Sequence, residues 1–301
     1  MFLAWREFKK GKRKRLDVQE FEFNLGNNLF QLHHELRTKT YQHGFYTPFY
    51  VTDPKLRHIH RATVRDRLVH HAVFRVLYHV FDKNFIFDSY SCRIDKGTHR
   101  AVNRLETFCG KLSYNNTRNI FVLKCDIRKF FDSVDHQTLI KLISSKIKDG
   151  NAVWLIEKII KSFNKGLPLG NVTSQLFANI YLNELDQFIK HGLKERYYIR
   201  YCDDFIILGY TVGHLMETVN KINNFLADNL KLTPHPDKII IRKYCQGIDF
   251  LGYVVMPTHR VLRTRTKKRL LRRANNINIV SYLGVLKHCK GYLISKKIFA
   301  K

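Results

Sequence analysis

The spacing of apolar and polar residues predicts a chain that alternates between helices and strands. Apolar residues three or four positions apart mark helices at residues 18–36, 61–80, 154–163, 176–189 and 215–230. Short apolar runs mark strands at residues 120–123, 205–208, 239–241 and 249–255, and residues 51–59 have an extended pattern. Because strands and helices follow one another irregularly, the pattern favours an α+β fold.

Polar residues predict where two of the helices begin. Thr63 or Asp66 suits the N-cap of the helix at 61–80. Ser133 or Asp135 suits the N-cap of a further helix, whose apolar face comprises residues 139, 140, 143 and 147. A stretch with two glycines and a proline, residues 166–170, predicts a structured turn before the helix at 176–189.

An acidic turn is predicted after the middle of the chain. The aromatic run 197–201 and the apolar run 205–208, which ends at Gly209, predict a hairpin with Asp203 and Asp204 at its tip. Adjacent carboxylates repel each other when they are partly desolvated, and a divalent cation relieves that cost. Taken alone, the pair fits either a metal site or a solvated acidic turn.

A third carboxylate, Asp126, follows the apolar run 120–123 and is predicted at the end of a central strand. Asp126, Asp203 and Asp204 could converge and hold two divalent ions, as in two-metal phosphoryl transfer. One ion would lower the pKa of a primer 3′-hydroxyl, and the other would hold the triphosphate of an incoming nucleotide. This is the chemistry of a polymerase.

The charge of the chain indicates a polyanionic partner. Lys and Arg number 53 against 25 Asp and Glu, which gives a net charge of +28 at pH 7. No apolar run reaches the length of a membrane span, so nucleic acid is favoured over a membrane. Residues 9–15 carry six basic side chains, which fits either a mobile solvated tail or an arm that contacts phosphates.

The end of the chain is chemically distinct. From residue 250 onward there is no acidic residue, whereas thirteen Lys and Arg occur, eight of them at 260–273. A helical run with this charge predicts a nucleic-acid-binding appendage that begins near Pro257. The six cysteines show no close pairing and no spacing typical of zinc sites, so reduced thiols in a cytoplasm are expected.

Seven successive blocks resemble, in order, those of reverse transcriptases: residues 41–71, 89–101, 124–136, 166–189, 201–208, 232–238 and 249–253. Within that superfamily, residues 89–93 (SYSCR), 96–99 (KGTH) and 169–175 (LGNVTSQ) most resemble the enzymes of diversity-generating retroelements. The resemblance implies a right-hand polymerase. A basic N-terminal extension would span residues 1–29, interleaved fingers and palm residues 30–256, and a small basic helical thumb residues 257–301. The palm would be an antiparallel sheet that carries the catalytic Asp residues.

The same resemblance implies that Asp126, Asp203 and Asp204 hold two Mg²⁺ ions, with the carbonyl oxygen of Ile127 as a further ligand. Lys238 matches a lysine that protonates or electrostatically assists the pyrophosphate leaving group. A surface lysine is an equally simple interpretation of Lys238.

Other residues match positions that contact the nucleotide. Arg93, Lys55 and Arg57 match fingers residues that bind the triphosphate, although the surroundings of the last two depart from the family pattern. Phe131 matches an aromatic residue that abuts the sugar and excludes a 2′-hydroxyl, and it is equally interpretable as a core aromatic.

Leu169 and Gln175 stand where many other reverse transcriptases have Gln and Pro. Residues expected to position the primer end are Phe250, Leu251, Gly252 and Tyr253. Residues of the thumb expected to bind nucleic acid are Arg263, Arg265, Lys267, Lys268, Arg269, Arg272 and Arg273.

The implied function is RNA-directed synthesis of error-prone cDNA from a template-repeat RNA, which diversifies a target gene by mutagenic retrohoming. Deoxynucleoside triphosphates, the template RNA, its cDNA and an accessory oligomeric basic protein are the implied partners, in a bacterium, archaeon or phage. Two alternatives stay open. One is a reverse transcriptase of another bacterial lineage, of a defence or CRISPR-linked type, and the other is an RNA-binding scaffold without turnover.

Overall fold

The chain forms two compact units, each built from three separated stretches. A computed structural model describes residues 1–53, 55–275 and 277–299. Unit 1 comprises Met1–Ile86, Arg128–Gln187 and Phe225–Thr233, and unit 2 comprises Phe87–Ile127, Phe188–Asn224 and Pro234–Lys301. The functional division into extension, fingers with palm, and thumb stays a prediction. Residue 276 and residues 300–301 of that thumb lie outside the described residues.

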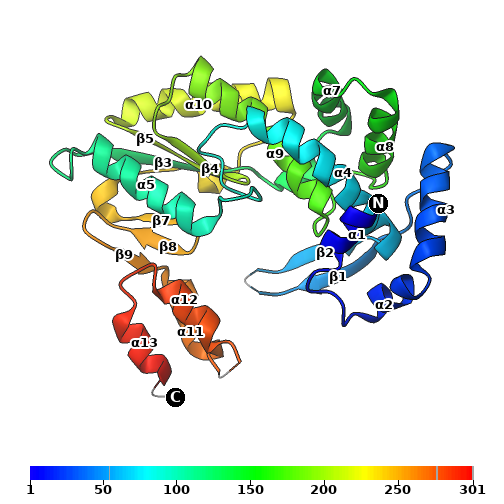
Figure 1. Cartoon of the computed structure of the whole chain (residues 1–301). Coiled ribbons are helices and arrows are strands. Elements are labelled where there is room, and N and C mark those ends of the chain that lie inside the picture. The colour runs from blue at the N-terminus through cyan, green and yellow to red at the C-terminus, as the bar shows by residue number, and fades with distance from the viewer. Residues whose placement is uncertain (54, 276, 300–301) are drawn as a thin grey trace. The chain divides into compact units, whose positions relative to one another are not determined.

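Unit 1 is mainly helical and carries one two-stranded hairpin (Figure 1). Helix α4 packs against α1, α2 and α9. The elements of unit 1 are α1 (Phe2–Phe8), α2 (Leu16–Phe23), α3 (Leu25–Arg37), β1 (Thr47–Val51), β2 (Arg57–Arg61), α4 (Val64–Phe81), the 3₁₀ turn Asp82–Asn84, α6 (Phe130–Ser133), α7 (His136–Lys146), α8 (Gly150–Lys161) and α9 (Val172–Gln187).

Two helix starts confirm the capping predictions. The Thr63 hydroxyl oxygen accepts a hydrogen bond of 3.2 Å from the backbone N–H of Asp66 and so caps α4. The Asp135 carboxylate accepts one of 3.2 Å from the N–H of Thr138 and so caps α7. Each cap satisfies a backbone donor that has no partner within its own helix.

Unit 2 contains a four-stranded antiparallel sheet in the order β4-β5-β3-β6 and a three-stranded sheet in the order β7-β8-β9. Its elements are α5 (Thr98–Leu112), β3 (Phe121–Asp126), the π-helical turn Phe188–Gly192, β4 (Tyr198–Tyr201), β5 (Asp204–Gly209), α10 (Val212–Leu230), the 3₁₀ turn Pro236–Lys238, β6 (Ile240–Lys243), the 3₁₀ turn Tyr244–Gln246, β7 (Ile248–Phe250), β8 (Tyr253–Val255), β9 (Arg260–Leu262), α11 (Thr264–Arg273), α12 (Ile279–Leu286) and α13 (Tyr292–Phe299). The last residues of α10 belong to unit 1.

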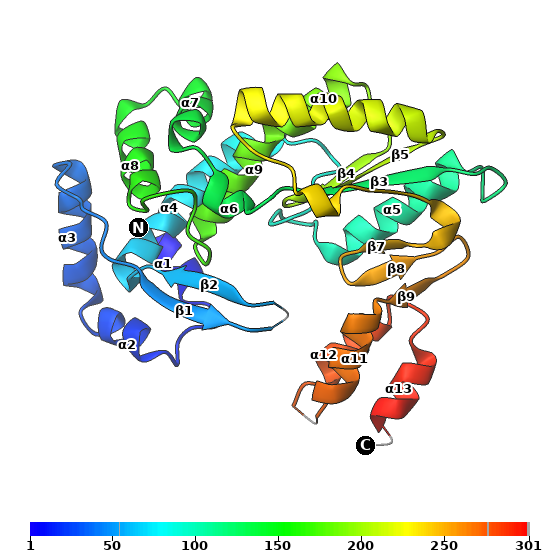
Figure 2. The ribbon, with the colours of Figure 1, turned by 180° about the vertical axis from the view of Figure 1, so that it is seen from behind.

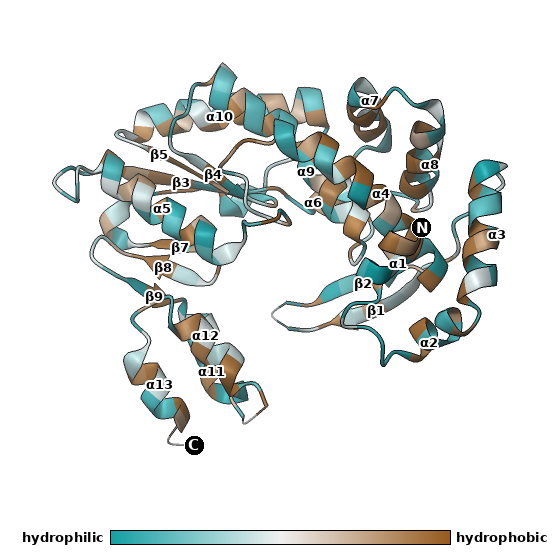
Figure 3. Cartoon of the chain, viewed as in Figure 1, coloured by the Kyte–Doolittle hydropathy of each residue, from teal (hydrophilic) through white to brown (hydrophobic). Residues whose placement is uncertain are grey.

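Strands β3, β4 and β5 of the four-stranded sheet are mostly buried on both faces, whereas the edge strand β6 is mostly exposed. On one face Val122, Ile206 and Leu208 join the apolar core formed with α5, while Leu123 and Ile207 alternate with them and are also buried. Figures 1 and 2 show α5 along one side of the sheet and α10 along the other. Figure 3 shows mainly hydrophobic colours along β5 and hydrophilic colours along much of β2. The central strands are therefore held rigidly where they end.

Three predicted elements differ from the structure. The helix expected at residues 18–36 is interrupted at Asn24, whose φ of −111° and ψ of 36° are not helical, and Asn favours such end positions. The extended segment 51–59 contains the connection between β1 and β2. The strand expected at 249–255 is a hairpin, because Leu251 and Gly252 both have positive φ, as in a two-residue type I′ turn.

The appendage expected to be helical begins with a strand, β9, and its helices start at Thr264. Across the part of the chain that the structure describes, no helix combines the length and apolar character needed to cross a membrane.

Candidate active site

The acidic turn predicted from the sequence is a two-residue hairpin loop. Tyr201 of β4 pairs with Asp204 of β5, and Cys202 and Asp203 form the connection between them. Cys202 has a φ of 57°, the conformation that a type II′ turn requires at its first central position and that normally selects Gly. A residue other than Gly in this conformation is strained, and surrounding contacts must hold it.

The register of the sheet brings Asp126 opposite Asp204. Asp126 is the last residue of β3, Asp204 is the first residue of β5, and the two are direct partners in the antiparallel ladder. Side chains directly opposite each other have Cβ atoms about 4.5–5.5 Å apart. The structure therefore confirms that Asp126 ends a central strand and places it at the same sheet end as Asp203 and Asp204.

Two lysines hold these carboxylates. The Nζ atom of Lys238 lies 2.7 Å from Oδ2 of Asp126, and the Nζ atom of Lys124 lies 3.2 Å from Oδ2 of Asp204. Lys124 also donates a hydrogen bond of 2.7 Å to the carbonyl oxygen of Asp249 in β7. Lys238 thus lies beside Asp126, and its role in the reaction stays a prediction. Lys124 was not predicted.

The carboxylates lie where negative charge is costly. Burial raises the pKa of Asp204 to about 6, with Asp126 and Asp203 adding to the rise and Lys124 opposing it. Burial, and after it the charge of Asp126, also raises the pKa of Asp203. Oδ1 of Asp204 is buried and has no hydrogen-bond partner among the described residues.

These features fit a divalent cation, because an added positive charge would favour the ionised carboxylates and give the unpartnered oxygen a ligand to bind. As they stand, no three His, Cys, Asp or Glu side chains within the described ranges are gathered closely enough to form a metal site. Ion pairing to Lys124 and Lys238 takes up one oxygen each of Asp204 and Asp126.

The backbone next to Asp126 is fixed by a neighbouring segment. The carbonyl oxygen of Asp126 accepts a hydrogen bond of 2.9 Å from the N–H of His235, and Ile127 forms an isolated antiparallel bridge with Pro234. This contact places Lys238, three residues after His235, beside the carboxylates. The role of the Ile127 carbonyl oxygen as a metal ligand stays a prediction.

Arg200, a residue that the sequence analysis missed, supports the turn from within. It is fully buried, and its guanidinium donates hydrogen bonds of 3.0 Å to the carbonyl oxygen of Cys202 and of 3.0 Å to Oγ of Ser89. Its backbone also pairs with the chain on both sides of Ser89. Arg200 therefore connects the strained turn before Asp203 to the segment that contains Arg93. In the sequence, the signal that could have identified Arg200 is a charged residue inside a strand of aromatic and apolar residues.

Arg93 lies in unit 2, and its guanidinium donates a hydrogen bond of 3.0 Å to the carbonyl oxygen of Ser89. The other residues predicted to contact the nucleotide belong to unit 1: Lys55, Arg57, Phe131, Leu169 and Gln175. Lys55, Arg57 and Gln175 are exposed. The predicted contacts of all six with a nucleotide stay predictions.

The backbone around Phe131 depends on a glycine. The N–H of Leu167 donates a hydrogen bond of 2.7 Å to the carbonyl oxygen of Phe131. A Cβ atom added to Gly166 would lie 2.2 Å from that oxygen, and Gly166 has a φ of 68°. No other residue type fits this place, so Gly166 fixes where the half-buried Phe131 lies.

The predicted primer-positioning residues form the β7–β8 hairpin. Phe250 and Tyr253 are buried on either side of the turn Leu251–Gly252, and the carbonyl oxygen of Gly252 accepts a hydrogen bond of 2.9 Å from Arg263. Gly252 has a φ of 90°, which favours glycine. The turn itself therefore accounts for a glycine here, and no contact with a nucleic acid is needed to explain it. Whether the hairpin contacts a primer stays a prediction.

The basic residues of the predicted thumb gather on α11. Leu270 is buried in the core of unit 2, whereas Arg265, Lys267, Lys268 and Arg272 are exposed. Arg269 is partly buried and Arg273 is exposed. Arg263 differs from the others, because it forms an ion pair with Asp249. The exposed basic side chains of α11 are accessible to the phosphates of a nucleic acid.

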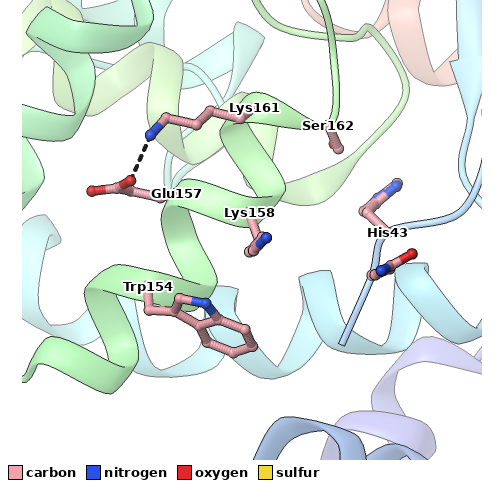
Figure 4. A pocket seen from close by; sticks show the side chains of 7 residues that line it. His43, Trp154, Glu157, Lys158, Lys161 and Ser162 are labelled. Carbon is pink, nitrogen blue, oxygen red and sulfur yellow. Dashed lines mark hydrogen bonds and ion pairs between the residues drawn. The ribbon is translucent and has the colours of Figure 1, made fainter. Parts of the chain in front are cut away.

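A cavity of about 480 Å³ in unit 1 is lined by none of these residues. It is lined by Gln42 and His43 and by side chains of and next to α8, among them Trp154 and Lys158 (Figure 4). Glu157 and Lys161 at its edge form an ion pair of 2.7 Å. None of the residues that line this cavity is a predicted site residue. Its volume alone is no reason to identify it as the catalytic centre.

Three partly buried carboxylates at one sheet end, two of them paired with lysines, are typical of proteins that perform metal-assisted phosphoryl transfer, a class that includes polymerases and nucleases. Comparison with known proteins defines the family. A family model described as reverse transcriptase (RNA-dependent DNA polymerase) matches residues 52–255, and the chain belongs to this family.

The curated relatives include a protein that is encoded by a group II intron. Protein YkfC of Escherichia coli (strain K12) is 27% identical, and the match covers 71% of this chain and 65% of that protein. The group II intron-encoded protein LtrA of Lactococcus lactis subsp. cremoris is 27% identical, and the match covers 81% of this chain and 51% of that protein. The chain thus spans less than two thirds of the length of these relatives.

A solved structure supports the fold. Apo telomerase from Candida tropicalis, truncated from its C-terminal domain, superposes with a TM-score of 0.56 at 12% identity, over 78% of this chain and 60% of that one. The chain therefore has the α+β fold predicted from the sequence, and this fold is similar to that of telomerase. The assignment of fingers, palm and thumb to residue ranges stays a prediction.

Proposed function

We propose that this chain is an RNA-directed DNA polymerase that extends a primer with deoxynucleoside triphosphates. The observation that carries the proposal is the pairing of Asp126 with Asp204 across β3 and β5, with Asp203 in the adjoining turn. Membership of the reverse transcriptase family supports it.

Asp126, Asp203 and Asp204, with the carbonyl oxygen of Ile127, would hold two Mg²⁺ ions. When bound, the ions supply activation of the primer 3′-hydroxyl and neutralisation of the leaving pyrophosphate. Lys238 holds its ammonium group beside Asp126 and provides positive charge, and a proton, for the leaving group. Lys124 restrains the Asp204 side chain from the neighbouring strand.

The remaining residues bind and select substrates in this proposal. Arg93, Lys55 and Arg57 bind the triphosphate, and Phe131 excludes a 2′-hydroxyl. The β7–β8 hairpin positions the primer end, and the exposed basic residues of α11 bind the phosphates of template and primer.

A primer-extension assay tests this function. The purified protein, a DNA primer annealed to an RNA template, deoxynucleoside triphosphates and Mg²⁺ should yield cDNA, and EDTA should stop the reaction. RNA binding without any extension, over a range of primers and of Mg²⁺ and Mn²⁺ concentrations, would favour the scaffold alternative.

Arg200 is expected to act as a positioning residue for Asp203. Arg200→Lys keeps the charge but cannot span both Cys202 and Ser89, so the turn should lose its alignment. We expect kcat to fall roughly 10- to 100-fold, with little change in KM for the nucleotide, because small misplacements of reacting groups cost about this much. The Mg²⁺ concentration for half-maximal rate should rise.

Ser89→Ala is the matched milder change, since it removes the hydroxyl that accepts a hydrogen bond from Arg200 and leaves the bond to Cys202. It should shift the Mg²⁺ requirement in the same direction by a smaller amount. A lower melting temperature in both variants with an unchanged Mg²⁺ requirement would show that Arg200 only stabilises the fold.

We further propose that the enzyme belongs to the diversity-generating type. It would copy a template-repeat RNA into error-prone cDNA for mutagenic retrohoming, together with an accessory oligomeric basic protein. The observation that favours this type is the segment Leu169 to Gln175, which departs from the Gln and Pro of many other reverse transcriptases. The competing proposal is the function of a group II intron-encoded protein, as the relative LtrA is named.

Leu169→Gln is expected to lower misincorporation opposite template adenine, because the resemblance to the diversity-generating enzymes implies errors opposite that base. The backbone at this position is fixed independently of the side chain, because the carbonyl oxygen of Leu169 accepts a hydrogen bond of 2.9 Å from His60. A glutamine there can hydrogen-bond near the incoming nucleotide, whereas leucine offers only apolar contact, so discrimination between correct and incorrect pairs should increase. Sequencing of the cDNA made with the proper RNA and partner measures the adenine error frequency.

Leu169→Met provides the control, because it keeps an apolar side chain of similar volume. Its error frequency should equal that of the parent. If Leu169→Gln also matches the parent at preserved cDNA yield, Leu169 only packs the turn and this role is refuted.

A further inference from the structure

The ammonium group of Lys124 joins the two sheets of unit 2. Lys124 stands opposite Ile206 in the ladder between β3 and β5, and Asp204 is its diagonal neighbour, two residues along. A long side chain reaches such a diagonal position, and Nζ of Lys124 lies 3.2 Å from Oδ2 of Asp204. The same Nζ donates the hydrogen bond of 2.7 Å to the carbonyl oxygen of Asp249, in β7 of the other sheet. Lys124 is therefore shared between a carboxylate expected to bind a metal ion and the backbone of the β7–β8 hairpin.

Asp249 is held in turn by Arg263, the residue just before α11. Nε of Arg263 donates a hydrogen bond of 2.6 Å to Oδ1 of Asp249, and Nη2 of the same guanidinium pairs with the same oxygen. Two donors in a planar fork fix the direction of this contact. The backbone N–H of Arg263 is bonded separately to the carbonyl oxygen of Gly252, so a change of the side chain leaves the chain in place. Figures 1 and 2 show α11 following β9, the outer strand of this sheet.

These contacts form one continuous series within unit 2, which comprises Arg263, Asp249, Lys124 and Asp204. The side chain of Arg263 is thus engaged inside the unit, whereas Arg265, two residues later, is exposed. At the other end of the series, Oδ1 of Asp204 is buried and has no hydrogen-bond partner among the described residues. The start of the basic helix is therefore connected to a carboxylate that still has an oxygen to offer a cation.

We propose that Lys124 is a tethered cation that competes with a metal ion for Asp204. Arg263 is then a positioning residue, because it holds Asp249 and so fixes the place of Lys124. An ammonium group and a divalent ion bind the same carboxylate and repel each other at this range. The contact of Lys124 with Asp249 is the shorter of its two, so Lys124 keeps a partner when a metal ion takes Asp204.

The inference rests on the proposed function in one respect, since it requires that the carboxylates bind a metal ion. It adds a regulation of that site: the segment that begins the basic helix sets how strongly the metal ion binds. Without Arg263, the unpaired carboxylate of Asp249 attracts Lys124 away from Asp204, and the metal ion should bind more tightly. Without Lys124, Arg263 has nothing to act through, so the effects of the two residues should not add.

Binding of Mn²⁺ to the full-length protein, without nucleic acid, tests the proposal. The paramagnetic resonance signal of free Mn²⁺ falls as the ion binds, which gives an affinity that does not depend on activity. Lys124→Met keeps an apolar stem and removes the charge, and it should bind Mn²⁺ about tenfold more tightly. Lys124→Gln is measured beside it and should bind more tightly in the same way, since it is also neutral. Asp204→Asn should lose the binding and so identifies the ion that is counted.

A double-mutant cycle separates a series of contacts from charge alone. Arg263→Gln should tighten Mn²⁺ binding about threefold in the parent, and by less than about 1.5-fold when Lys124→Met is already present. Equal effects in both backgrounds would mean that Arg263 acts only through its charge, which would overturn its role as a positioning residue. Unchanged affinity in both Lys124 variants would overturn the competition. Mn²⁺ binding that survives Asp204→Asn would overturn this inference together with the proposed metal site, whereas an additive cycle leaves that metal site standing.

Arg265→Gln is the matched control, because it removes the same charge two residues away from an exposed position. It should leave Mn²⁺ affinity within about 1.5-fold of the parent and weaken template-primer binding roughly fivefold, as the loss of one phosphate contact does. Arg263→Gln should show the opposite pattern, with template-primer affinity within about twofold of the parent. Arg263→Lys can still pair with Asp249 and should restore the Mn²⁺ affinity of the parent. Weaker template-primer binding with unchanged Mn²⁺ affinity in Arg263→Gln would make Arg263 a phosphate contact and refute the proposal.

Discussion

Replacing Asp203 or Asp204 by Asn is expected to abolish cDNA synthesis. Each change keeps the shape of the side chain but removes a negative charge that would bind Mg²⁺. Loss of a metal ligand removes several kcal/mol of transition-state stabilisation, which corresponds to a rate at least about 10³-fold lower. Primer extension on an RNA template measures the rate, and the affinity for the template-primer should stay within about threefold of the parent, because the phosphates are bound elsewhere.

The stability of these variants separates a catalytic role from a structural one. The pKa of Asp204 is raised to about 6 by burial, so at neutral pH the folded protein holds an ionised carboxylate in an unfavourable place. Asn removes that cost, and the metal-free Asp204→Asn variant should melt at or above the temperature of the parent. Asp237→Asn is the control, because this exposed carboxylate beside Lys238 has the same charge but lies outside the site. A large drop in melting temperature together with lost RNA binding would instead indicate that the Asp pair maintains the fold.

Replacing Phe131 by Ala is expected to admit ribonucleotides. Phe131 is half-buried, and its ring packs edge-on against Phe130 with centroids 5.3 Å apart, so one part of the ring is exposed beyond the core. If that part excludes a 2′-hydroxyl, its removal should raise the ratio of ribonucleotide to deoxynucleotide kcat/KM roughly 10- to 100-fold, which is the range that steric discrimination achieves. Single-nucleotide extension with each substrate measures the ratio.

Phe131→Tyr keeps the ring and should keep the exclusion. A ratio that does not change in Phe131→Ala, accompanied by a lower melting temperature, would show that Phe131 only packs in the core. Gly166 fixes the backbone at this position in both variants, so the comparison isolates the side chain.

The sequence could predict the carboxylate hairpin because two local signals agree there. Aromatic and apolar runs on each side mark strands, and the polar stretch between them is short enough to be only a turn. Asp126 was predictable at a strand end for the same reason. The sequence could not predict that Asp126 lies directly opposite Asp204. This register depends on pairing between segments about eighty residues apart, and no local pattern indicates it.

Lys124 and Arg200 show what a local interpretation misses. Lys124 and Asp126 are two residues apart in one strand. Side chains at this spacing point to the same face of a sheet, so the sequence could have placed both on one face. Its partner, Asp204, could be known only from the sheet order. Arg200 lies in a strand that is otherwise aromatic and apolar, and a buried guanidinium needs acceptors that sequence cannot supply.

The predicted element boundaries that the structure contradicts have a common cause. At Asn24, at residues 51–59 and at Leu251–Gly252 the apolar pattern continues through a break that the backbone makes. Apolar spacing reports which side chains are buried, and two elements that bury the same side can share one pattern. Leu251, a leucine with a φ of 51°, gave no sign of a turn by residue type.

The interleaving of the two units has a consequence for how the protein is made. Unit 1 begins with Met1–Ile86 but is completed only by Phe225–Thr233, so its first segment leaves the ribosome well before its last. At synthesis rates of about 5–20 residues per second, that interval lasts roughly ten seconds or more. During the first part of it, the side chains of α4 that pack against α9 have not yet met that helix. The nascent chain therefore has to remain soluble without a finished core, and its dense positive charge, which repels other copies, serves that need before any ligand is bound.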